Sequence, residues 1–199
     1  MGKDGHEHGH EHGHEHGRRS SRGVLDGARI METWGPRPGE TWLDIGAGDG
    51  HLSLAAARAG GPETRVIALD RDGEWLAGAL AEALDEGIDN LGAVVADAVR
   101  DIPLPAESVD TALLANVLHG FVANGELERV MEVLLRVLKP GGRILVFEFK
   151  KAETPVGPPP AIRLGPDDVA AAFAPWGFVL HRTDKVGIYH HAVELRRAA

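Results

Sequence analysis

Residues 43–50, which read LDIGAGDG, combine glycines and carboxylates in a pattern that could bind a small ligand. Gly46, Gly48 and Gly50 allow a tight backbone turn and leave no Cβ to collide with a ligand lying against it. Asp44 stands two positions before the first glycine, inside the apolar run that leads into the turn. The sequence therefore predicts a binding site in which backbone and carboxylate face the same ligand.

The positions of the glycines distinguish two classes of cofactor. A dinucleotide site has the pattern G-x-G-x-x-G, and reading from Gly46 its third glycine falls on His51. The carboxylate of Asp44 also suits a cationic ligand better than a diphosphate. S-adenosylmethionine carries a sulfonium and an ammonium group, and both are stabilised by nearby carboxylates and carbonyls. We therefore favour S-adenosylmethionine over a nicotinamide dinucleotide.

Asp70 ends the next apolar run, twenty residues beyond Gly50. An acidic residue at the end of a second strand is placed to accept hydrogen bonds from ribose hydroxyls. Both cofactor classes use such a residue, so Asp70 indicates a nucleoside ligand without choosing between them.

From about residue 24, short apolar runs alternate with helix-forming segments, which is typical of an α/β protein with a mainly parallel sheet. Strands are predicted at Thr41–Ile45, Arg65–Leu69, Ala93–Ala96, Val109–Ala115 and Arg143–Phe149, with a closing pair at Phe178–His181 and His190–Leu195. Helices are predicted at Leu52–Ala59, from a cap at Asp72 to about Gly87, over Leu127–Leu138 and at Pro166–Phe173.

The helix predicted over 127–138 has one apolar stripe, at i, i+3, i+4, i+7, i+8 and i+11. The stripe consists of Leu127, Val130, Met131, Leu134, Leu135 and Leu138. We interpret these residues as core. Asp110, near the beginning of the fourth strand, is also interpreted as structural.

The composition is that of an ordinary soluble globular protein, with 43% hydrophobic and 26% charged residues. A length of 199 residues suits one domain. The chain has neither an apolar run of about 20 residues nor the apolar core of a signal peptide, so we expect no membrane insertion and a cytoplasmic location. A net charge of -9 opposes attraction to nucleic acid, which favours a small-molecule substrate.

Residues 6–17 read HEHGHEHGHEHG and hold no apolar side chain. We therefore predict a disordered His-rich tail at residues 1–22 and one domain at residues 23–199. In an extended chain the six histidines would share one side, where they could chelate nickel, zinc or copper. The alternative is a purification tag or a passive metal sponge. No metal site is predicted in the domain, and the absence of cysteine excludes thiolate ligands.

The ordered motifs from residue 41 onward resemble those of the class I S-adenosylmethionine-dependent methyltransferases. The matching segments are LDIGAGDG, Asp70-Arg71, VADA at 95–98, Asn116 and LKPGG at 138–142. The resemblance implies an α/β fold, a Rossmann-like three-layer sandwich with a seven-stranded, mainly parallel sheet and helices on both faces. It also implies the cofactor S-adenosyl-L-methionine and the product S-adenosyl-L-homocysteine.

The resemblance assigns a part of the cofactor to each motif. The methionine and ribose side would be lined by Asp44, Gly46, Gly48 and Gly50, and the ribose would be held by Asp70. The adenine would lie beside Arg71, donate its exocyclic amine to Asp97 and meet the backbone of Ala98, while Asn116 would face the methionine moiety.

Two further stretches narrow the resemblance. NVLH at 116–119, and the segment from FKK at 149–151 to GPP at 157–159, are similar to small methyltransferases of the ubiquinone and menaquinone biosynthesis group, which have a methyltransferase type 11 domain. The part before Thr41 matches nothing distinctive.

Methyl transfer chiefly requires an aligned nucleophile and the exclusion of water. If the acceptor must lose a proton, His119 is the first candidate for the base, because it follows the fourth strand and imidazole titrates near neutral pH. Lys150 and Lys151, after the fifth strand, either receive an anionic substrate or form a solvated pair. Weaker candidates for the base are Glu148, Tyr189, His190 and His191.

The sequence thus predicts an S-adenosylmethionine-dependent methyltransferase that acts on a small-molecule acceptor. The alternatives are a non-catalytic accessory protein that binds S-adenosylmethionine or metal, and, less favoured, an NAD-dependent oxidoreductase.

Overall fold

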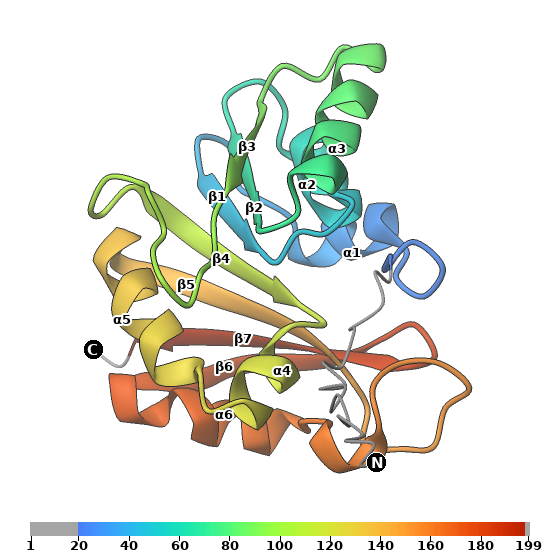
Figure 1. The fold of residues 1–199 in the computed structure, drawn as a ribbon, viewed down its shortest axis with the longest axis vertical. Coiled ribbons are helices and arrows are strands. Elements are labelled where there is room, and N and C mark those ends of the chain that lie inside the picture. The colour runs from blue at the N-terminus through green and yellow to red at the C-terminus, as the bar shows by residue number, and fades with distance from the viewer. Residues whose placement is uncertain (1–19, 198–199) are drawn as a thin grey trace, which may run out of the picture.

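A computed structural model describes residues 20–197 of the chain. Seven strands form one sheet in the order β3-β2-β1-β4-β5-β7-β6 (Figure 1). Neighbouring strands are parallel except at β7, which is antiparallel to both β5 and β6. The strands are β1 Thr41–Ile45, β2 Arg65–Asp70, β3 Leu91–Val95, β4 Val109–Ala115, β5 Leu138–Phe149, β6 Phe178–Val186 and β7 His190–Arg197. The predicted seven-stranded, mainly parallel sheet is confirmed.

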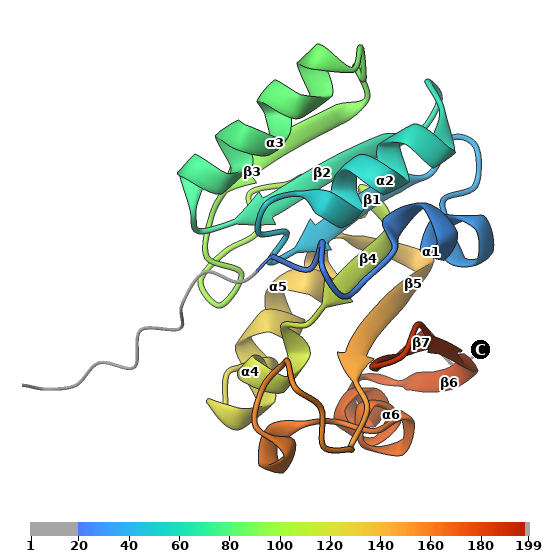
Figure 2. The same ribbon diagram turned by 90° about the vertical axis from the view of Figure 1, so that its right-hand side faces the viewer.

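Helices cover both faces of this sheet, which confirms the three-layer sandwich (Figure 2). One face carries α1 Gly27–Trp34, α2 His51–Gly60 and α3 Gly73–Asp85. The other carries α4 Leu118–Ala123, α5 Leu127–Val137 and α6 Pro166–Phe173, with short 3-10 turns at Pro160–Ile162 and Ala174–Trp176. None of the helices within residues 20–197 has the length and apolar character needed to cross a membrane.

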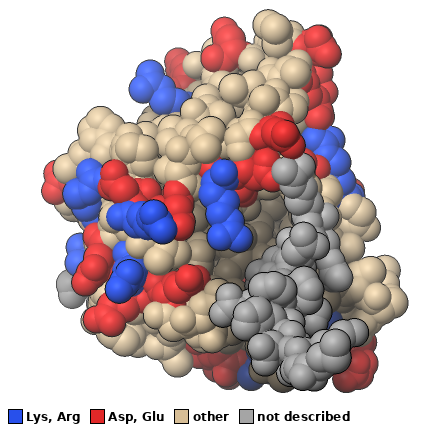
Figure 3. Space-filling view, in the orientation of Figure 1, with Lys and Arg blue, Asp and Glu red and all other residues tan. Residues whose placement is uncertain are grey.

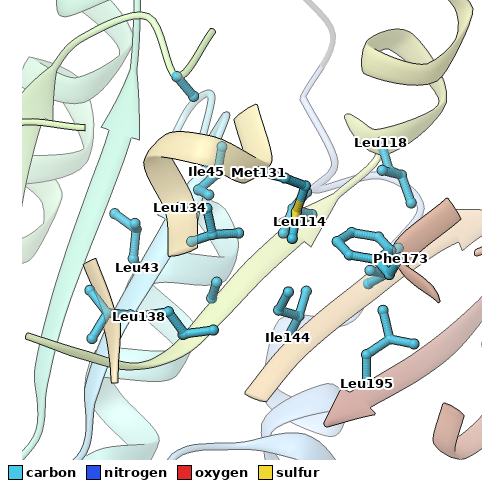
Figure 4. Packing of buried hydrophobic residues seen from close by; sticks show 14 of the residues in the cluster. Leu43, Ile45, Leu114, Leu118, Met131, Leu134, Leu138, Ile144, Phe173 and Leu195 are labelled. Carbon is cyan, nitrogen blue, oxygen red and sulfur yellow. The ribbon is translucent and has the colours of Figure 1, made fainter. Parts of the chain in front are cut away.

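The alternation of side chains along each strand divides the core into two clusters. Leu43 and Ile45 of β1 belong to the cluster under α5 and α6, whereas Trp42 belongs to the cluster under α1 and α2. Figure 4 shows the first cluster, where leucines and isoleucines of the sheet meet Met131, Leu134 and Phe173. Asp44 is on the same side of β1 as Trp42, so the strand directs its carboxylate toward α2.

The region between α5 and β5 differs from the prediction. Leu138, predicted as the end of a helix, is the first residue of β5, because α5 ends at Val137. Leu138 pairs with Val109 and Arg143 pairs with Thr111, so the KPGG segment is an irregularity within the strand. Lys139 forms an ion pair with Asp110 at 2.7 Å, which supports this irregular segment. Leu138 is still only 6% exposed, as expected of a core residue.

Two helices, α1 and α4, and the ends of several strands were not predicted. α1 is short, and α4 has no side-chain cap, so neither has a strong sequence signal. β3 begins two residues before the predicted strand, at Leu91. β6 and β7 extend beyond their predicted ends. β6 is an edge strand, and its mostly exposed residues give no apolar pattern that marks where it ends.

Candidate active site

The glycine turn lies at a topological switch point. β2 and β4 flank β1 on opposite sides, and the turn connects the carboxyl end of β1 to α2. Open α/β sheets bind ligands outside the carboxyl ends of their strands at such a point. We call the ends of β1, β2 and β3 the glycine-turn edge. We call the ends of β4 and β5, with the beginning of β7, the imidazole edge.

All three glycines of the turn have left-handed backbone, with φ of +70° at Gly46, +56° at Gly48 and +69° at Gly50. A Cβ at Gly50 would lie 2.4 Å from the Cβ of Ala79, and one at Gly46 would lie 2.6 Å from Cγ1 of Val117. The glycines are therefore needed for packing against α3 and the segment after β4, as well as for the backbone conformation.

Asp44 lies beneath the turn and is 3% exposed. The hydroxyl of Ser53 on α2 donates to its carboxylate at 2.6 Å. Burial raises the pKa of Asp44 to about 7; the Ser53 hydrogen bond opposes this rise, and the charges of Asp70 and Asp49 add to it. No ion pair within residues 20–197 includes Asp44. The site therefore favours a positive charge near this carboxylate.

Asp70 connects the end of β2 to the glycine turn. One carboxylate oxygen accepts the backbone N–H of Gly48 at 2.8 Å, and the other accepts the N–H of Asp72 at 2.9 Å. The carbonyl of Leu69 accepts two more N–H groups of the turn, at 2.8 and 3.0 Å. These bonds fix the turn against β2.

The end of β3 combines an apolar surface with a capped turn. Val95 is 64% exposed and pairs in register with Asp70. Asp97 accepts the N–H of Val99 at 3.0 Å, while the side chain of Ala98 is buried in the core. Arg71 is exposed beside Asp70. The glycine-turn edge therefore brings together all the predicted cofactor residues except Asn116.

The first described residues are attached to the glycine turn. Ser20 and Arg22, which the prediction assigned to the tail, donate to Asp49 at 2.6 and 2.7 Å. Arg22 also donates to Glu82 of α3. Although burial acts against it, the hydrogen bonds from Ser20 and Arg22 lower the pKa of Asp49 below its ordinary value. The turn is thus held from both sides, by β2 and by the segment before α1.

Asn116 lies on the imidazole edge and has an unusual backbone conformation for a residue other than glycine, with φ of +58°. Nε2 of His190 lies 3.0 Å from its side-chain oxygen. His190 stacks on Phe149 with ring centroids 4.0 Å apart. Burial, together with the charges of His191, Lys150 and Arg163, lowers the pKa of His190 to about 4, so its imidazole is neutral at physiological pH.

His119 lies at the beginning of α4, and Glu148 near the end of β5 binds it. Nδ1 of His119 is 3.0 and 2.9 Å from the two carboxylate oxygens, and the backbone N–H of His119 donates to the same carboxylate at 3.0 Å. Nδ1 of His190 and Nε2 of His191 are buried and have no hydrogen-bond partner among residues 20–197. Five polar side chains, from the residue after β4 and from α4, β5 and β7, thus lie on the imidazole edge: Asn116, His119, Glu148, His190 and His191.

The two lysines after β5 are engaged with the protein. Nζ of Lys150 donates to the carbonyls of Gly187 and Ile188, at 3.3 and 2.7 Å. Lys151 forms an ion pair with Asp168 at 2.6 Å. The β6–β7 turn therefore accounts for Lys150, and α6 accounts for Lys151.

A cavity of about 950 Å³ lies between α1, α2 and the β6–β7 turn. Its lining is mainly apolar and includes Leu25, Met31, Ala55, Ile188 and Tyr189. His51, which directly follows the glycine turn, also lines it. The volume is in the range of small-molecule sites.

Sequence reasoning missed some contacts on both the glycine-turn edge and the imidazole edge. The Ser53–Asp44 and His190–Asn116 bonds join residues from separate elements, and no local pattern marks them. Glu148 had a usable signal, because a lone carboxylate in a buried strand needs a partner. It was considered only as a base, whereas the structure pairs it with His119.

Comparisons of this chain with known protein families and proteins agree with this geometry. Residues 43–142 match a family model described as a methyltransferase domain. A ubiquinone/menaquinone biosynthesis C-methyltransferase from Brucella abortus is 36% identical over 121 residues, which are 60% of this chain and 44% of the relative. The chain thus spans less than half the length of that relative.

Solved structures extend the likeness over nearly the whole chain. A SAM-dependent methyltransferase from Aquifex aeolicus is 26% identical with a TM-score of 0.79, covering 91% of this chain and 95% of that one. The [4+2]-cyclase SpnF, at 17% identity and a TM-score of 0.69 over 87% of this chain and 80% of its own, shares the fold alone. From the family model, which matches half of the sequence, the chain belongs to the family of S-adenosylmethionine-dependent methyltransferases.

Proposed function

We propose that this chain binds S-adenosylmethionine at the glycine-turn edge and transfers its methyl group to a small-molecule acceptor at the imidazole edge. The single observation that carries the proposal is the buried carboxylate of Asp44. A carboxyl group with a pKa of about 7 is costly to ionise in the free protein. A nearby sulfonium or ammonium group would stabilise the ionised form, and a diphosphate would not.

The other residues of this edge fit the remaining parts of the cofactor. Asp70 would hold the ribose, since its carboxylate lies between the turn and β2. Val95 offers exposed apolar surface for a flat base, flanked by Arg71 and by the backbone of Ala98. Asp97 would accept the exocyclic amine, and Asn116 would face the methionine part. Within residues 20–197, Arg22 is the one basic side chain hydrogen-bonded to the turn, and it is paired with Asp49. No other lysine or arginine in this range is bonded to the turn where it would attract a diphosphate.

The bound cofactor would supply an activated methyl group on sulfur. The protein's own contribution is to hold the acceptor in line and to exclude water from the site. The apolar cavity beside His51 has the size of a small-molecule site, and Tyr189 in its lining directly precedes β7, whose beginning belongs to the imidazole edge. On the face shown in Figure 3, acidic and basic side chains are interspersed, and the net charge is -9. Both features favour a small molecule over nucleic acid.

Two further predictions stand beside this proposal. We propose a cytoplasmic location, which the absence of a membrane-crossing helix among residues 20–197 supports. The HEHG repeat lies outside the described residues, and metal chelation by it stays a prediction. Titration of the full chain with Ni²⁺, compared with a variant in which the six repeat histidines are alanine, tests it.

Calorimetric titration of the full chain with S-adenosylmethionine, S-adenosylhomocysteine and NADH tests the proposed function. We expect micromolar binding of the first two and none of NADH. Binding of NADH alone would overturn the proposal and make the turn a dinucleotide site. Binding of S-adenosylmethionine without formation of S-adenosylhomocysteine over a broad acceptor screen would instead favour the accessory protein.

A further inference from the structure

Glu148 is a fully buried carboxylate in an apolar strand. Its side chain has no exposed area, and the neighbouring residues Phe147 and Phe149 are buried as well. Burying a carboxylate costs several kcal/mol unless hydrogen bonds compensate. Here the compensation comes from one residue, because His119 donates both its backbone N–H and its ring Nδ1.

The pairing fixes the tautomer of His119. A carboxylate only accepts hydrogen bonds, so Nδ1 must carry a proton to lie 2.9 and 3.0 Å from both oxygens of Glu148. In the neutral ring Nε2 then keeps its lone pair. Nε2 makes no hydrogen bond to any residue in the range 20–197, and the His119 side chain is 14% exposed. The pair is closed at the carboxylate and accessible at the ring.

His119 also lies close to the proposed cofactor site. Val117, two residues before it, packs so closely on the glycine turn that a Cβ at Gly46 would be 2.6 Å from its Cγ1. Asn116, at the end of β4, is fixed by His190. The ring of His119, on the imidazole edge, is therefore held next to the glycine-turn edge.

We propose that Glu148 is a positioning residue that holds His119 as a general base, and that the acceptor is a protic nucleophile such as a hydroxyl or N–H compound. This inference rests on the proposed function. Nε2 of His119 takes the proton of the acceptor X–H, the freed electron pair of X forms the bond to the methyl carbon, and the electron pair of the C–S bond returns to sulfur. A thioether or tertiary amine acceptor has no proton to lose and would leave this pair without a role.

Imidazole ¹⁵N NMR of the full chain tests the positioning. The His119 signal is assigned by its loss in His119→Asn, and Glu148→Gln removes the charge at nearly unchanged shape. We expect wild-type His119 at pH 8 to show Nδ1 protonated and Nε2 bare, and Glu148→Gln to give a mixture of tautomers. A proton on Nε2 in the wild type, or an unchanged tautomer in a folded Glu148→Gln, would overturn the proposal.

A second measurement on the wild type needs no variant to fold. Carbethoxylation by diethyl pyrocarbonate is followed by peptide mass spectrometry, with exposed His181 as the internal control. We expect saturating S-adenosylhomocysteine to slow modification of His119 at least several-fold and to leave His181 unchanged. If S-adenosylhomocysteine binds by calorimetry but does not protect His119, the base is misplaced and the inference fails. If S-adenosylhomocysteine does not bind at all, the proposed function fails. The His119 tautomer measured by ¹⁵N NMR then decides by itself whether Glu148 positions His119.

Discussion

The two edges of the site differ in how their polar groups are satisfied. On the glycine-turn edge, Asp70 and Asp97 accept hydrogen bonds from backbone N–H groups, and Asp44 and Asp49 accept hydrogen bonds from side chains. On the imidazole edge, side chains bind one another across separate elements, and the buried atoms Nδ1 of His190 and Nε2 of His191 have no hydrogen-bond partner in the described part of the chain. The first edge is a preformed cradle. The second is an arrangement that a bound acceptor or water would complete.

This difference suggests a division of roles. A cofactor shared by a family can be recognised by backbone and a few acidic side chains within short segments. An acceptor particular to one protein is recognised by side chains that the topology brings together. Variants on the first edge should therefore change cofactor affinity. Variants on the second should change stability and acceptor chemistry while leaving cofactor affinity nearly constant.

Asp70→Ala should have the largest effect on binding. The change removes the proposed ribose acceptor and the carboxylate that accepts the N–H groups of Gly48 and Asp72, so the affinity for S-adenosylmethionine should fall on the order of 100-fold or more. Asp110→Ala is the matched control, because Asp110 accepts from Thr41 N and Lys139 at the opposite end of the sheet. Calorimetry on both variants should show the loss of S-adenosylmethionine affinity only in Asp70→Ala. An equal loss in both variants would show that the affinity does not depend specifically on the glycine-turn edge.

Gly50→Ala should be the most destabilising small change in the turn. Its Cβ would meet Ala79 at 2.4 Å and the backbone has φ of +69°. Overpacking and left-handed strain together should cost about 3 kcal/mol. Gly177→Ala has a similar left-handed backbone, with φ of +79°, but nothing lies within 4 Å, so strain alone should cost about 1 kcal/mol. Urea denaturation compares the two, and equal losses would mean that helix packing does not require the glycine.

The imidazole edge should make stability depend on pH. Unfolded histidine takes up a proton below about pH 6.5, whereas His190 with a folded pKa of about 4 does not, so stability falls as the pH decreases between these values. Between pH 7 and pH 5 the loss from His190 should be about 2 kcal/mol. His190→Gln keeps a donor for Asn116 and should reduce the pH-dependent loss by that amount in urea denaturation. An unchanged pH dependence would show that His190 is solvated.

Sequence reasoning could propose the residues of the glycine-turn edge, because each of its motifs is contiguous and follows a strand. Local patterns of this kind survive in a single sequence. The pairing of Glu148 with His119 spans 29 positions, and that of His190 with Asn116 spans 74. Such contacts follow from the order of strands in the sheet, which hydrophobic periodicity does not specify.

The fold shows the same limit. The buried strands were located by their apolar residues, although Asp44 and Glu148 interrupt two of these runs and β5 begins at Leu138 instead of Arg143. The edge strand β6 was predicted too short, because most of its side chains are exposed. Leu138 was placed in a helix because its spacing continued the stripe, although α5 ends one residue earlier. The burial of Leu138 was predicted correctly, whereas its backbone conformation was not.

The central claim, that Asp44 accepts the positive charge of the cofactor, is tested most directly by proton release on binding. Asp44 has a pKa of about 7 in the free protein, so a cation that ionises it should release about half a proton at pH 7. The affinity should accordingly weaken as the pH falls below 7. Calorimetry of S-adenosylmethionine binding in buffers of different ionisation enthalpy measures the release, with Asp44→Asn as the control. Our account predicts release by the wild type that is absent in Asp44→Asn; equal release by both, or none by the wild type, would contradict it.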